Sequence, residues 1–385
     1  MARTLKSDKW LFVATLLLVA TGIVMVYSAS AMYAVGLTHN PKPAYYFLFK
    51  QSVWAFLGLV AMAVTMRLDY RVYRQPIVIW SAFGAVVIAL TLALLSSPVN
   101  GSRRWLSLEG LTVQPSEFAK LAIVLFAAAL LERRMHRIND IRYSLVPLGA
   151  ATLVFVLLVY PEPDFGASIS LIAFVAAMIF VAGLSWRYMA IGLGLLAPAA
   201  ALVVKLEPYR VRRLLAFMHP EQYAHGAGFH PIQLMIAVGS GGTWGRGLMG
   251  SVQKLGGFLP EPHTDSIFAI ISEELGLVGS TLILALFCVV AWRGLRAAVL
   301  APDRFGALLA VGLTMMISAQ AFVNVSMVLG LLPNKGIALP FISSGGSSLL
   351  TNLIATGILL NISQQASFVA ARRTGDLTLS APAEA

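Results

Sequence analysis

Residues 10–30 read WLFVATLLLVATGIVMVYSAS, a run without a charged side chain. A helix rises about 1.5 Å per residue, so a run of this length crosses a hydrocarbon core of roughly 30 Å. Arg3, Lys6 and Lys9 precede the run, as they would in a signal peptide, but no convincing small-residue cleavage site follows it. We therefore interpret this run as a retained first membrane span.

Apolar runs of the same kind recur along nearly the whole chain. The 385 residues are 58% hydrophobic and only 12% charged, with a mean hydropathy of +0.80. A soluble domain needs more polar residues to cover its surface. Backbone in lipid must satisfy its own hydrogen bonds, which restricts spanning segments to helices or a closed barrel. Because the runs are continuous rather than alternating, the predicted fold class is an all-α polytopic membrane protein.

Ten spans and one large loop are predicted. The spans cover residues 10–30, 51–66, 76–96, 118–131, 145–161, 165–184, 189–205, 266–291, 306–330 and 346–366. Residues 1–373 are predicted to form a single membrane domain, with a large extracytoplasmic loop at about 206–265 between the seventh and eighth spans. The small, polar segment 374–385 is predicted to be a disordered cytoplasmic tail.

The distribution of positive charge predicts the orientation. With both termini in the cytoplasm, the inner segments hold more lysine and arginine than the outer ones, most clearly in loops 67–75 and 132–144. The outer cations concentrate in segments 97–117 and 205–265, where topology does not explain them. The net charge of +11 lies in loops that flank the membrane, so we do not expect nucleic acid as a partner.

The first outer cluster leads into the fourth span and reads NGSRRWLSLEGLTVQPSEFAK over residues 100–120. Its proline and Glu117 suit a helix start, and Lys120 lies on the same face one turn deeper. An ionisable pair at this depth indicates function. The alternative is an interfacial ion pair in which Lys120 extends toward the headgroups. Arg103 and Arg104 would contact either lipid headgroups or a substrate.

The large loop begins with Tyr209-Arg-Val-Arg-Arg213, which places three guanidiniums beside an aromatic ring. Guanidiniums bind phosphate bidentately, but such a run is also typical of an interfacial anchor. Gln233 precedes the glycine-rich stretch GSGGTWGRG at 239–247, whose backbone could approach a ligand closely or turn back at the membrane surface. The stretch lacks Gly-Lys-Ser/Thr, so we exclude an NTP-binding loop. The following histidines are expected to be structural rather than ligands: His219, His225 and His230.

The densest polar constellation reads LPEPHTDSIFAIISEE over residues 259–274. Asp265 lies at the outer mouth of the eighth span, just after Glu261 and His263. Partial withdrawal from water raises the pKa of a carboxylate toward the range of a general base, although Asp265 could also simply cap the helix. Asp265 and Glu261 could hold Mg²⁺ or Mn²⁺, but their spacing matches no strong metal signature, so the metal ligands stay unknown. No organic cofactor is indicated.

The last unusual segment reads LLPNKGIALPFISSGGSS over residues 331–348 and joins the ninth and tenth spans. Its prolines and glycines in apolar context predict a re-entrant wall, which is tolerated in a membrane only where it is buried in protein or lines a cavity. All of these polar segments fall on the outer face. Together they predict a site for an anionic amphiphile at the outer lipid boundary.

Taken in order, these motifs resemble the SEDS (shape, elongation, division and sporulation) family over essentially the whole chain. The resemblance rests on Arg104-Trp105, Gln114-Pro-Ser-Glu117, Lys120, Gly239-Ser-Gly-Gly242, Leu259-Pro-Glu261, His263-Thr-Asp265, Glu273-Glu274, Leu339-Pro-Phe-Ile-Ser343 and Gly345-Gly-Ser-Ser348. Lys335-Gly336 and Met25-Val-Tyr-Ser-Ala-Ser30 look more like the division branch, FtsW, than the elongation branch, RodA. Ser344, Ser266 and Asn334 depart from the usual tyrosine, phenylalanine and threonine.

The resemblance implies a ten-helix peptidoglycan glycosyltransferase of the bacterial inner membrane. It would polymerise lipid II for septal wall synthesis, together with a class B penicillin-binding protein, other divisome proteins and membrane lipid. Asp265 would take the proton from the acceptor sugar while undecaprenyl pyrophosphate leaves with inversion. The residues expected to bind the substrate are Arg104, Trp105, Glu117, Lys120, Arg210, Arg213, Gln233, Lys254, Glu261, His263, Ser343 and Ser347.

Two other functions would also suit a polytopic chain. A lipid II flippase predicts charged residues along a path through the bilayer, whereas Lys120, Glu273 and Glu274 are all predicted to lie near the outer side. A non-catalytic scaffold for a class B penicillin-binding protein would need only complete apolar helices. It gives no reason for Asp265 to lie beside cationic loops.

Overall fold

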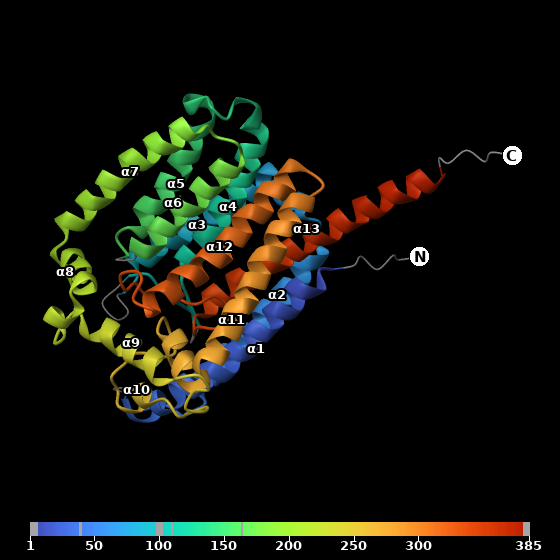
Figure 1. Ribbon diagram of the computed structural model, residues 1–385. Helices are drawn as coiled ribbons and strands as arrows, with labels where there is room; N and C mark the ends of the chain where they lie inside the picture. Colours follow the sequence, from blue (N-terminus) through green and yellow to red (C-terminus); the bar gives the residue numbers. More distant parts are fainter. Residues whose placement is uncertain (1–6, 38–40, 98–102, 109–110, 163–164, 380–385) are drawn as a thin grey trace.

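The computed structural model describes residues 7–37, 41–97, 103–108, 111–162 and 165–379. Long helices form a bundle, and the described chain ends lie on the same side of it (Figure 1). The long helices are α1 (Lys9–Met32), α2 (Tyr46–Arg67), α3 (Pro76–Leu95), α4 (Pro115–Arg134), α5 (Val146–Val159), α6 (Phe165–Val181), α7 (Trp186–Leu206), α11 (Ile267–Leu300), α12 (Arg304–Val328) and α13 (Gly346–Leu379).

Within the described residues, 8 helices are long and apolar enough to cross a membrane: α1, α2, α3, α5, α7, α11, α12 and α13. The shorter α6 is equally apolar over Gly166–Val181. α4 has the length of a span but carries Glu117, Lys120 and Glu132. These helices correspond one to one to the predicted spans, so the prediction of an all-α polytopic membrane protein is confirmed.

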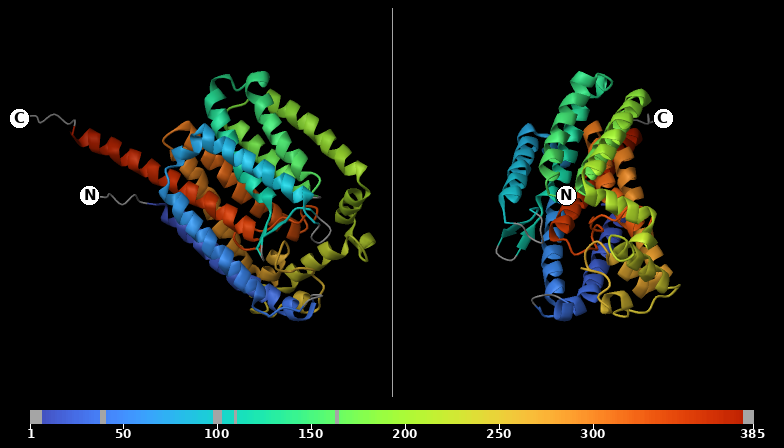
Figure 2. Two further views of the ribbon diagram at one scale, coloured as in Figure 1. Left: turned by 180° about the vertical axis from the view of Figure 1, so that it is seen from behind. Right: turned by 90° about the vertical axis from the view of Figure 1, so that its left-hand side faces the viewer.

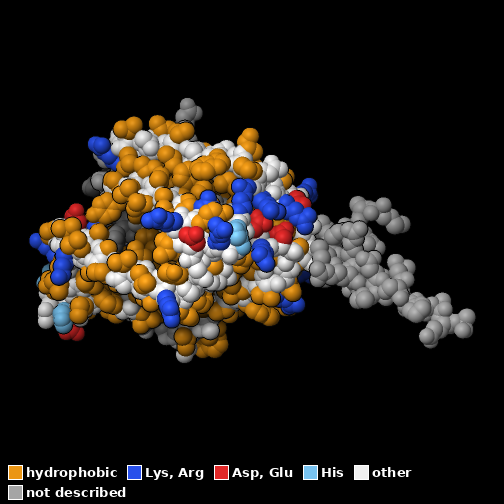
Figure 3. Space-filling model, turned by 90° about the horizontal axis from the view of Figure 1, so that it is seen from above, with side chains coloured by type: hydrophobic (Ala, Val, Ile, Leu, Met, Phe, Trp, Pro, Cys, Tyr) orange, Lys and Arg blue, Asp and Glu red, His pale blue; other side chains and the backbone are white. Residues whose placement is uncertain are grey.

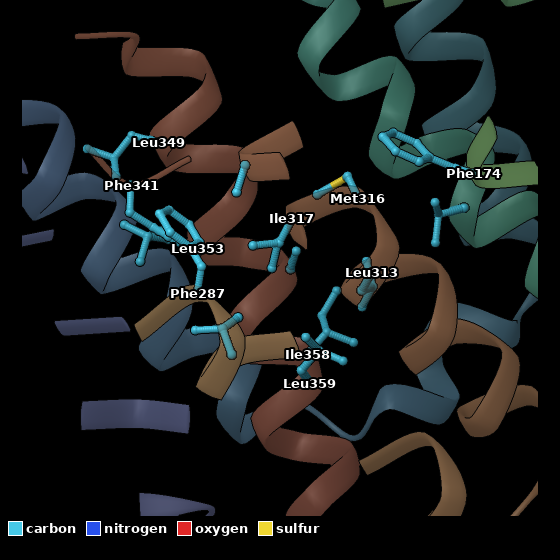
Figure 4. Packing of buried hydrophobic residues seen from close by; sticks show 14 of the residues in the cluster. Phe174, Phe287, Leu313, Met316, Ile317, Phe341, Leu349, Leu353, Ile358 and Leu359 are labelled. Carbon is cyan, nitrogen blue, oxygen red and sulfur yellow. The ribbon is translucent and has the colours of Figure 1, made fainter. Parts of the chain in front are cut away.

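The core of the bundle is built by α4, α12 and α13. Phe287 of α11 and Phe341 stack with their ring centroids 6.5 Å apart, and Leu353 and Ile317 fill the space beside them (Figure 4). In contrast, α7 has no buried residue and lies on the outside of the bundle (Figures 1 and 2). α7 therefore presents its apolar side chains to the surroundings, as lipid requires.

We call the face that carries loops 68–75 and 135–145 the inner face, following the predicted orientation, and the opposite one the outer face. On the inner face, the Tyr70 hydroxyl donates to Asp303 at 2.7 Å, and Arg71 pairs with the same carboxylate at 3.5 Å. Asp8 caps α1 and pairs with Arg293. Acidic and basic side chains gather in one part of the view from above, while hydrophobic side chains cover much of the rest (Figure 3). These contacts join helices that are distant in sequence.

The outer segments are more structured than the predicted loop. They contain a two-stranded antiparallel hairpin and three helices: β1 (Leu106–Leu108), β2 (Leu111–Val113), α8 (Pro208–Met218), α9 (Phe229–Ser240) and α10 (Val252–Leu255). α8 and α9 follow α7 around the edge of the bundle (Figure 1).

The predicted tail is partly wrong, because α13 continues to Leu379. The segment after the membrane span contains Ala370 and Ala371 and no proline before residue 380, so no proline forces the helix to stop at residue 374. Residues 380–385 lie outside the described part of the chain.

Candidate active site at the outer end of α11

α11 is interrupted near the outer face at Gly276, whose φ of 65° and ψ of −164° are not helical. The break leaves backbone groups without helical partners, and the glycine-rich segment 241–247 supplies them. The cross-segment hydrogen bonds run from Arg246 N to Glu273 O at 3.0 Å, from Gly247 N to Glu274 O at 3.0 Å, from Leu277 N to Gly242 O at 2.9 Å and from Val278 N to Thr243 O at 3.2 Å. The segment therefore turns back against a broken helix.

The glycines in this contact are required by its close backbone approach. A Cβ on Gly276 would lie 2.3 Å from the amide nitrogen of Gly245, and one on Gly241 would lie 1.9 Å from the carbonyl oxygen of Ser272. Gly276 also has a positive φ, which L side chains rarely adopt. A side chain at either position would separate the two segments.

Glu273 and Glu274 lie at the end of the first half of α11, and both are fully buried. Glu274 forms an ion pair with Lys254 and accepts a hydrogen bond from the Ser28 hydroxyl at 2.5 Å. Glu273 accepts from the Ser251 hydroxyl at 2.5 Å. We call Ser28, Ser251, Lys254, Glu273 and Glu274 the buried charge cluster. It joins α1, α10 and α11.

Lys254 is predicted to bind substrate, but the structure places its ammonium in contacts within the protein. Its ammonium donates to the carbonyl oxygen of Ser28 at 3.0 Å, to the hydroxyl of Ser28 at 3.1 Å and to Glu274. An ammonium has three hydrogens, and these contacts use all of them. Lys254 is also only 2% exposed.

Four further residues expected at the substrate are buried within the protein. Glu117 and Lys120 pair at 2.7 Å, and Lys120 does not extend outward because it is only 4% exposed. The hydroxyl oxygen of Ser343 accepts from Leu339 N at 2.8 Å, and that of Ser347 accepts from Gln114 N at 2.9 Å. These side chains stabilise the entry of α4 and the 339–347 turn rather than facing a ligand.

Asp265 immediately precedes α11, at the outer end of its first half, and remains partly exposed. Its Oδ1 lies 3.1 Å from Thr264 Oγ1 and 3.4 Å from Ser266 Oγ, and its backbone oxygen accepts from Asn324 Nδ2 at 2.9 Å. Its Oδ2 accepts no hydrogen bond within the part of the chain that the structure describes. One carboxylate oxygen is thus held, and the other is available.

Two further charges share the neighbourhood of Asp265. Burial raises the pKa of Glu261, the negative charge of Asp265 raises it further, and the positive charge of Arg104 opposes both effects. Arg104 lies 5.8 Å from the ring centroid of Trp105, and its buried Nε has no partner among the described atoms. We call Arg104, Glu261 and Asp265 the open charge cluster, because none of the three forms an ion pair within 4 Å in the described chain.

His263 was expected to contact the substrate, but its ring is only 4% exposed. It packs 4.1 Å from the ring centroid of Phe47 and 5.4 Å from that of Tyr33. Burial and the positive charge of Lys50 lower the pKa of His263 to about 4, so the ring is neutral at physiological pH. In the described structure His263 packs inside the protein and does not line the surface of the site.

The structure does not place all of the remaining predicted substrate-binding residues together. Gln233 of α9 is partly exposed and has no side-chain hydrogen bond within the described chain, so it is available to a ligand. Arg213 donates to the carbonyl oxygen of Asn334 at 3.4 Å, which places α8 beside the 333–336 segment. Arg210 instead donates to the Tyr160 hydroxyl at 3.2 Å and packs on that ring, so it anchors α8 to the bundle.

His230 was expected to be structural, and the structure gives it a specific place. Its Nε2 lies 3.1 Å from Ser266 Oγ and its Nδ1 lies 2.6 Å from Asn334 Nδ2. Burial lowers its pKa, as does Arg213, while Asp265 raises it. The sequence could have indicated that His230 lies near the site, because it precedes Gln233 by three positions and shares its helix face.

A metal site built by the protein alone is not present in the described residues, where no three His, Cys, Asp or Glu side chains gather at ion-binding distance. Glu261 and Asp265 influence one another electrostatically, as two neighbouring carboxylates do. Mg²⁺ is commonly bound by one or two carboxylates together with substrate phosphates. The two residues therefore fit a divalent cation only when a phosphate-bearing ligand completes the site.

A cavity of about 640 Å³ lies elsewhere, between α5, α6 and α7. Its lining is almost entirely apolar and includes Thr152, Ile179 and Trp186, toward the inner ends of these helices. None of the predicted site residues lines it. It provides no charged path from the inner face to the open charge cluster.

Comparison with known proteins gives a consistent result. The family described as cell cycle protein FtsW/RodA/SpoVE matches residues 8–368. Stage V sporulation protein E of Bacillus subtilis is 40% identical over 94% of this chain and 98% of its own length. A probable peptidoglycan glycosyltransferase FtsW of Geobacter sp. is 37% identical over 92% of this chain and 96% of its own length.

Solved structures agree with the sequence comparison. A chain from a peptidoglycan synthase complex, described as coordinating polymerization and crosslinking, has a TM-score of 0.78 and 29% identity, covering 94% of this chain and 99% of its own. The rod shape determining protein RodA of Thermus thermophilus has a TM-score of 0.68 and 28% identity, covering 94% of this chain and 98% of its own.

Proposed function

Because the chain belongs to the FtsW/RodA/SpoVE family of cell cycle proteins, we propose that it is a peptidoglycan glycosyltransferase that polymerises lipid II and releases undecaprenyl pyrophosphate. The observation that carries the proposal is the open charge cluster, where Asp265 has an unbonded carboxylate oxygen and Arg104 has a buried, unpartnered nitrogen. A base and a cation are the two groups that this reaction requires from the protein.

In the proposed reaction, Asp265 Oδ2 takes the proton from the 4-hydroxyl of the acceptor sugar. The acceptor oxygen forms a bond to the anomeric carbon of the donor while the bond from that carbon to the diphosphate breaks. The configuration inverts, so no second carboxylate nucleophile is needed. Arg104 and Arg213 stabilise the negative charge that gathers on the diphosphate.

Glu261 and Asp265 would hold a divalent cation, Mg²⁺ or Mn²⁺, together with that diphosphate. Such an ion would supply further positive charge to the leaving group. Trp105 and Gln233 would contact the sugars or the lipid. In contrast to the initial expectations, the proposal leaves out the side chains of Lys120, Lys254, Ser343 and Ser347, because contacts within the protein already use them.

We propose that the protein acts in the cytoplasmic membrane at the division septum, with a class B penicillin-binding protein as its partner. The similarity to a chain of a peptidoglycan synthase complex supports a partner that cross-links. The names of the FtsW relatives support the division branch. The apolar lining of the cavity between α5, α6 and α7 argues against a flippase, because a polar headgroup needs a polar path.

The test is polymerisation of labelled lipid II by the purified protein with its partner, comparing wild type with Asp265→Ala and Asp265→Asn. We expect wild-type glycan chains and no chains from either variant, with unchanged elution in size-exclusion chromatography. Glu221→Gln is the matched control, since it removes an exposed carboxylate from the same outer region. Normal glycan chains from Asp265→Asn would remove this residue from the mechanism.

A further inference from the structure

A directed chain of polar contacts leads from the 333–336 segment to Asp265. Asn334 Nδ2 lies 2.6 Å from His230 Nδ1, His230 Nε2 lies 3.1 Å from Ser266 Oγ, and Ser266 Oγ lies 3.4 Å from Asp265 Oδ1. An amide nitrogen can only donate, so Nδ1 of His230 accepts and Nε2 carries the ring hydrogen. His230 therefore donates to Ser266 Oγ, whose own hydrogen is directed to Asp265.

Ser266 is needed for this task because Thr264 is already engaged. The Thr264 hydroxyl lies 2.8 Å from the carbonyl oxygen of Glu261 and 3.1 Å from Asp265 Oδ1. A hydroxyl has one hydrogen, and the carbonyl is the nearer acceptor. Ser266 is thus the hydroxyl whose hydrogen remains for Asp265, and its direction depends on what Ser266 accepts.

We propose that His230 is a positioning residue for Asp265: by donating from Nε2 to Ser266 Oγ, it directs the Ser266 hydroxyl to Oδ1 and leaves Oδ2 as the oxygen that receives the proton. The assignment of the proton to Oδ2 rests on the proposed function, whereas the His230–Ser266 hydrogen bond does not. Oδ2 lies on the side of Gly336, where a Cβ would be 3.8 Å away.

The first test reads the ring directly and needs no enzymatic activity. Nitrogen NMR of the full-length protein with ¹⁵N-labelled histidine, in detergent, would report the protonation of each nitrogen among the 6 histidines. The His230 signals are assigned by their loss in His230→Gln. We expect a neutral ring with hydrogen on Nε2, whose chemical shift changes in Ser266→Ala. Hydrogen on Nδ1 would overturn the proposal, and so would an Nε2 chemical shift that is the same in wild type and in Ser266→Ala.

The second test measures polymerisation of lipid II with the partner protein. We expect His230→Phe to lower kcat about tenfold with little change in KM, and His230→Gln to recover most of that loss because its amide can still donate. Since His230 acts through Ser266, the double variant His230→Phe/Ser266→Ala should be no slower than Ser266→Ala alone. His225→Phe, at an exposed histidine of the same loop, is the matched control.

The two tests separate the inference from the function on which it rests. Additive losses in the double variant, or a His230→Gln variant as slow as His230→Phe, would overturn the positioning role even when wild type is active. An inactive wild type that shows the expected ring and its response to Ser266→Ala would overturn the proposed function and retain the His230–Ser266 contact.

Discussion

The two charge clusters at the outer end of α11 differ in whether their charged atoms have partners within the described chain. In the buried charge cluster, Glu273 and Glu274 are both fully buried, each accepts from a hydroxyl, and Glu274 also pairs with Lys254. In the open charge cluster, Asp265 and Arg104 each keep an atom without a partner in the described chain. A buried charge in a membrane protein needs a partner, whereas a charged atom near the surface that no protein group engages is available to a ligand.

The clusters are connected by a short piece of helix. The first half of α11 runs from Ile267 to the break at Gly276, with Asp265 just before one end and Glu273 and Glu274 near the other. The buried charge cluster fixes this half-helix to α1 and α10. Rigid support of this kind holds a reactive group within the small tolerance that catalysis requires.

The largest effect is expected from the open charge cluster. Asp265→Asn should lower the rate of glycan polymerisation at least about 100-fold, because it removes the general base. The thermal unfolding midpoint should stay near that of wild type, because Oδ2 has no partner to lose. A clear fall in that midpoint would mean that Asp265 belongs with the buried charges.

The next largest effect is expected from the buried charge cluster and should concern stability. Lys254→Met leaves Glu274 without its cation, which costs about 3–5 kcal/mol for a buried pair. We expect a lower thermal unfolding midpoint in detergent, with activity falling in step with the folded fraction. Adding Glu274→Gln should restore part of the midpoint, since it removes the stranded charge. An unchanged midpoint in Lys254→Met would contradict the assignment.

A smaller effect on rate is expected at Arg104. Arg104→Ala should reduce polymerisation roughly 10- to 100-fold by removing one group that stabilises the leaving diphosphate. Stability should change little, because the buried Nε has no partner in the described chain. Arg103→Ala, at the exposed neighbouring arginine, is the matched control. Equal losses at both positions would indicate general attraction to anionic lipid instead.

The smallest effect is expected on the inner face. Arg71 pairs with Asp303 at 3.5 Å, but its side chain is 55% exposed. Exposed pairs contribute about 0–1 kcal/mol. Arg71→Ala should therefore leave both the unfolding midpoint and polymerisation close to wild type. A loss comparable to that of Lys254→Met would show that exposure does not separate the two classes of ion pair.

The helices were predictable from sequence because hydrophobic length and helix-start signals are local. The predicted spans match the helices, and α4 begins at Pro115 with Glu117 in its first turn, as expected. The glycines of 239–247 predicted either a close approach to a ligand or a turn at the membrane surface, and the segment turns back against α11. The continuation of α13 past residue 374 was missed, because polar composition does not by itself end a helix.

The site was only partly predictable, because partner choice is not local. Residue type marked Lys254 and Asp265 alike as candidate site residues, yet one forms a buried ion pair and the other is partly exposed. Their partners lie elsewhere in the chain: Lys254 contacts Ser28, which is 226 positions away. The His230–Ser266 contact likewise joins residues 36 positions apart. Spacing within a motif cannot reveal such pairings.

The break at Gly276 also has a consequence for biosynthesis. The glycine-rich segment is translated before α11, and four of its backbone groups have their partners on that later helix: Arg246 N, Gly247 N, Gly242 O and Thr243 O. The final arrangement around Asp265 can therefore form only after the eighth span has been inserted. The outer face around Asp265 thus completes its folding late in biosynthesis.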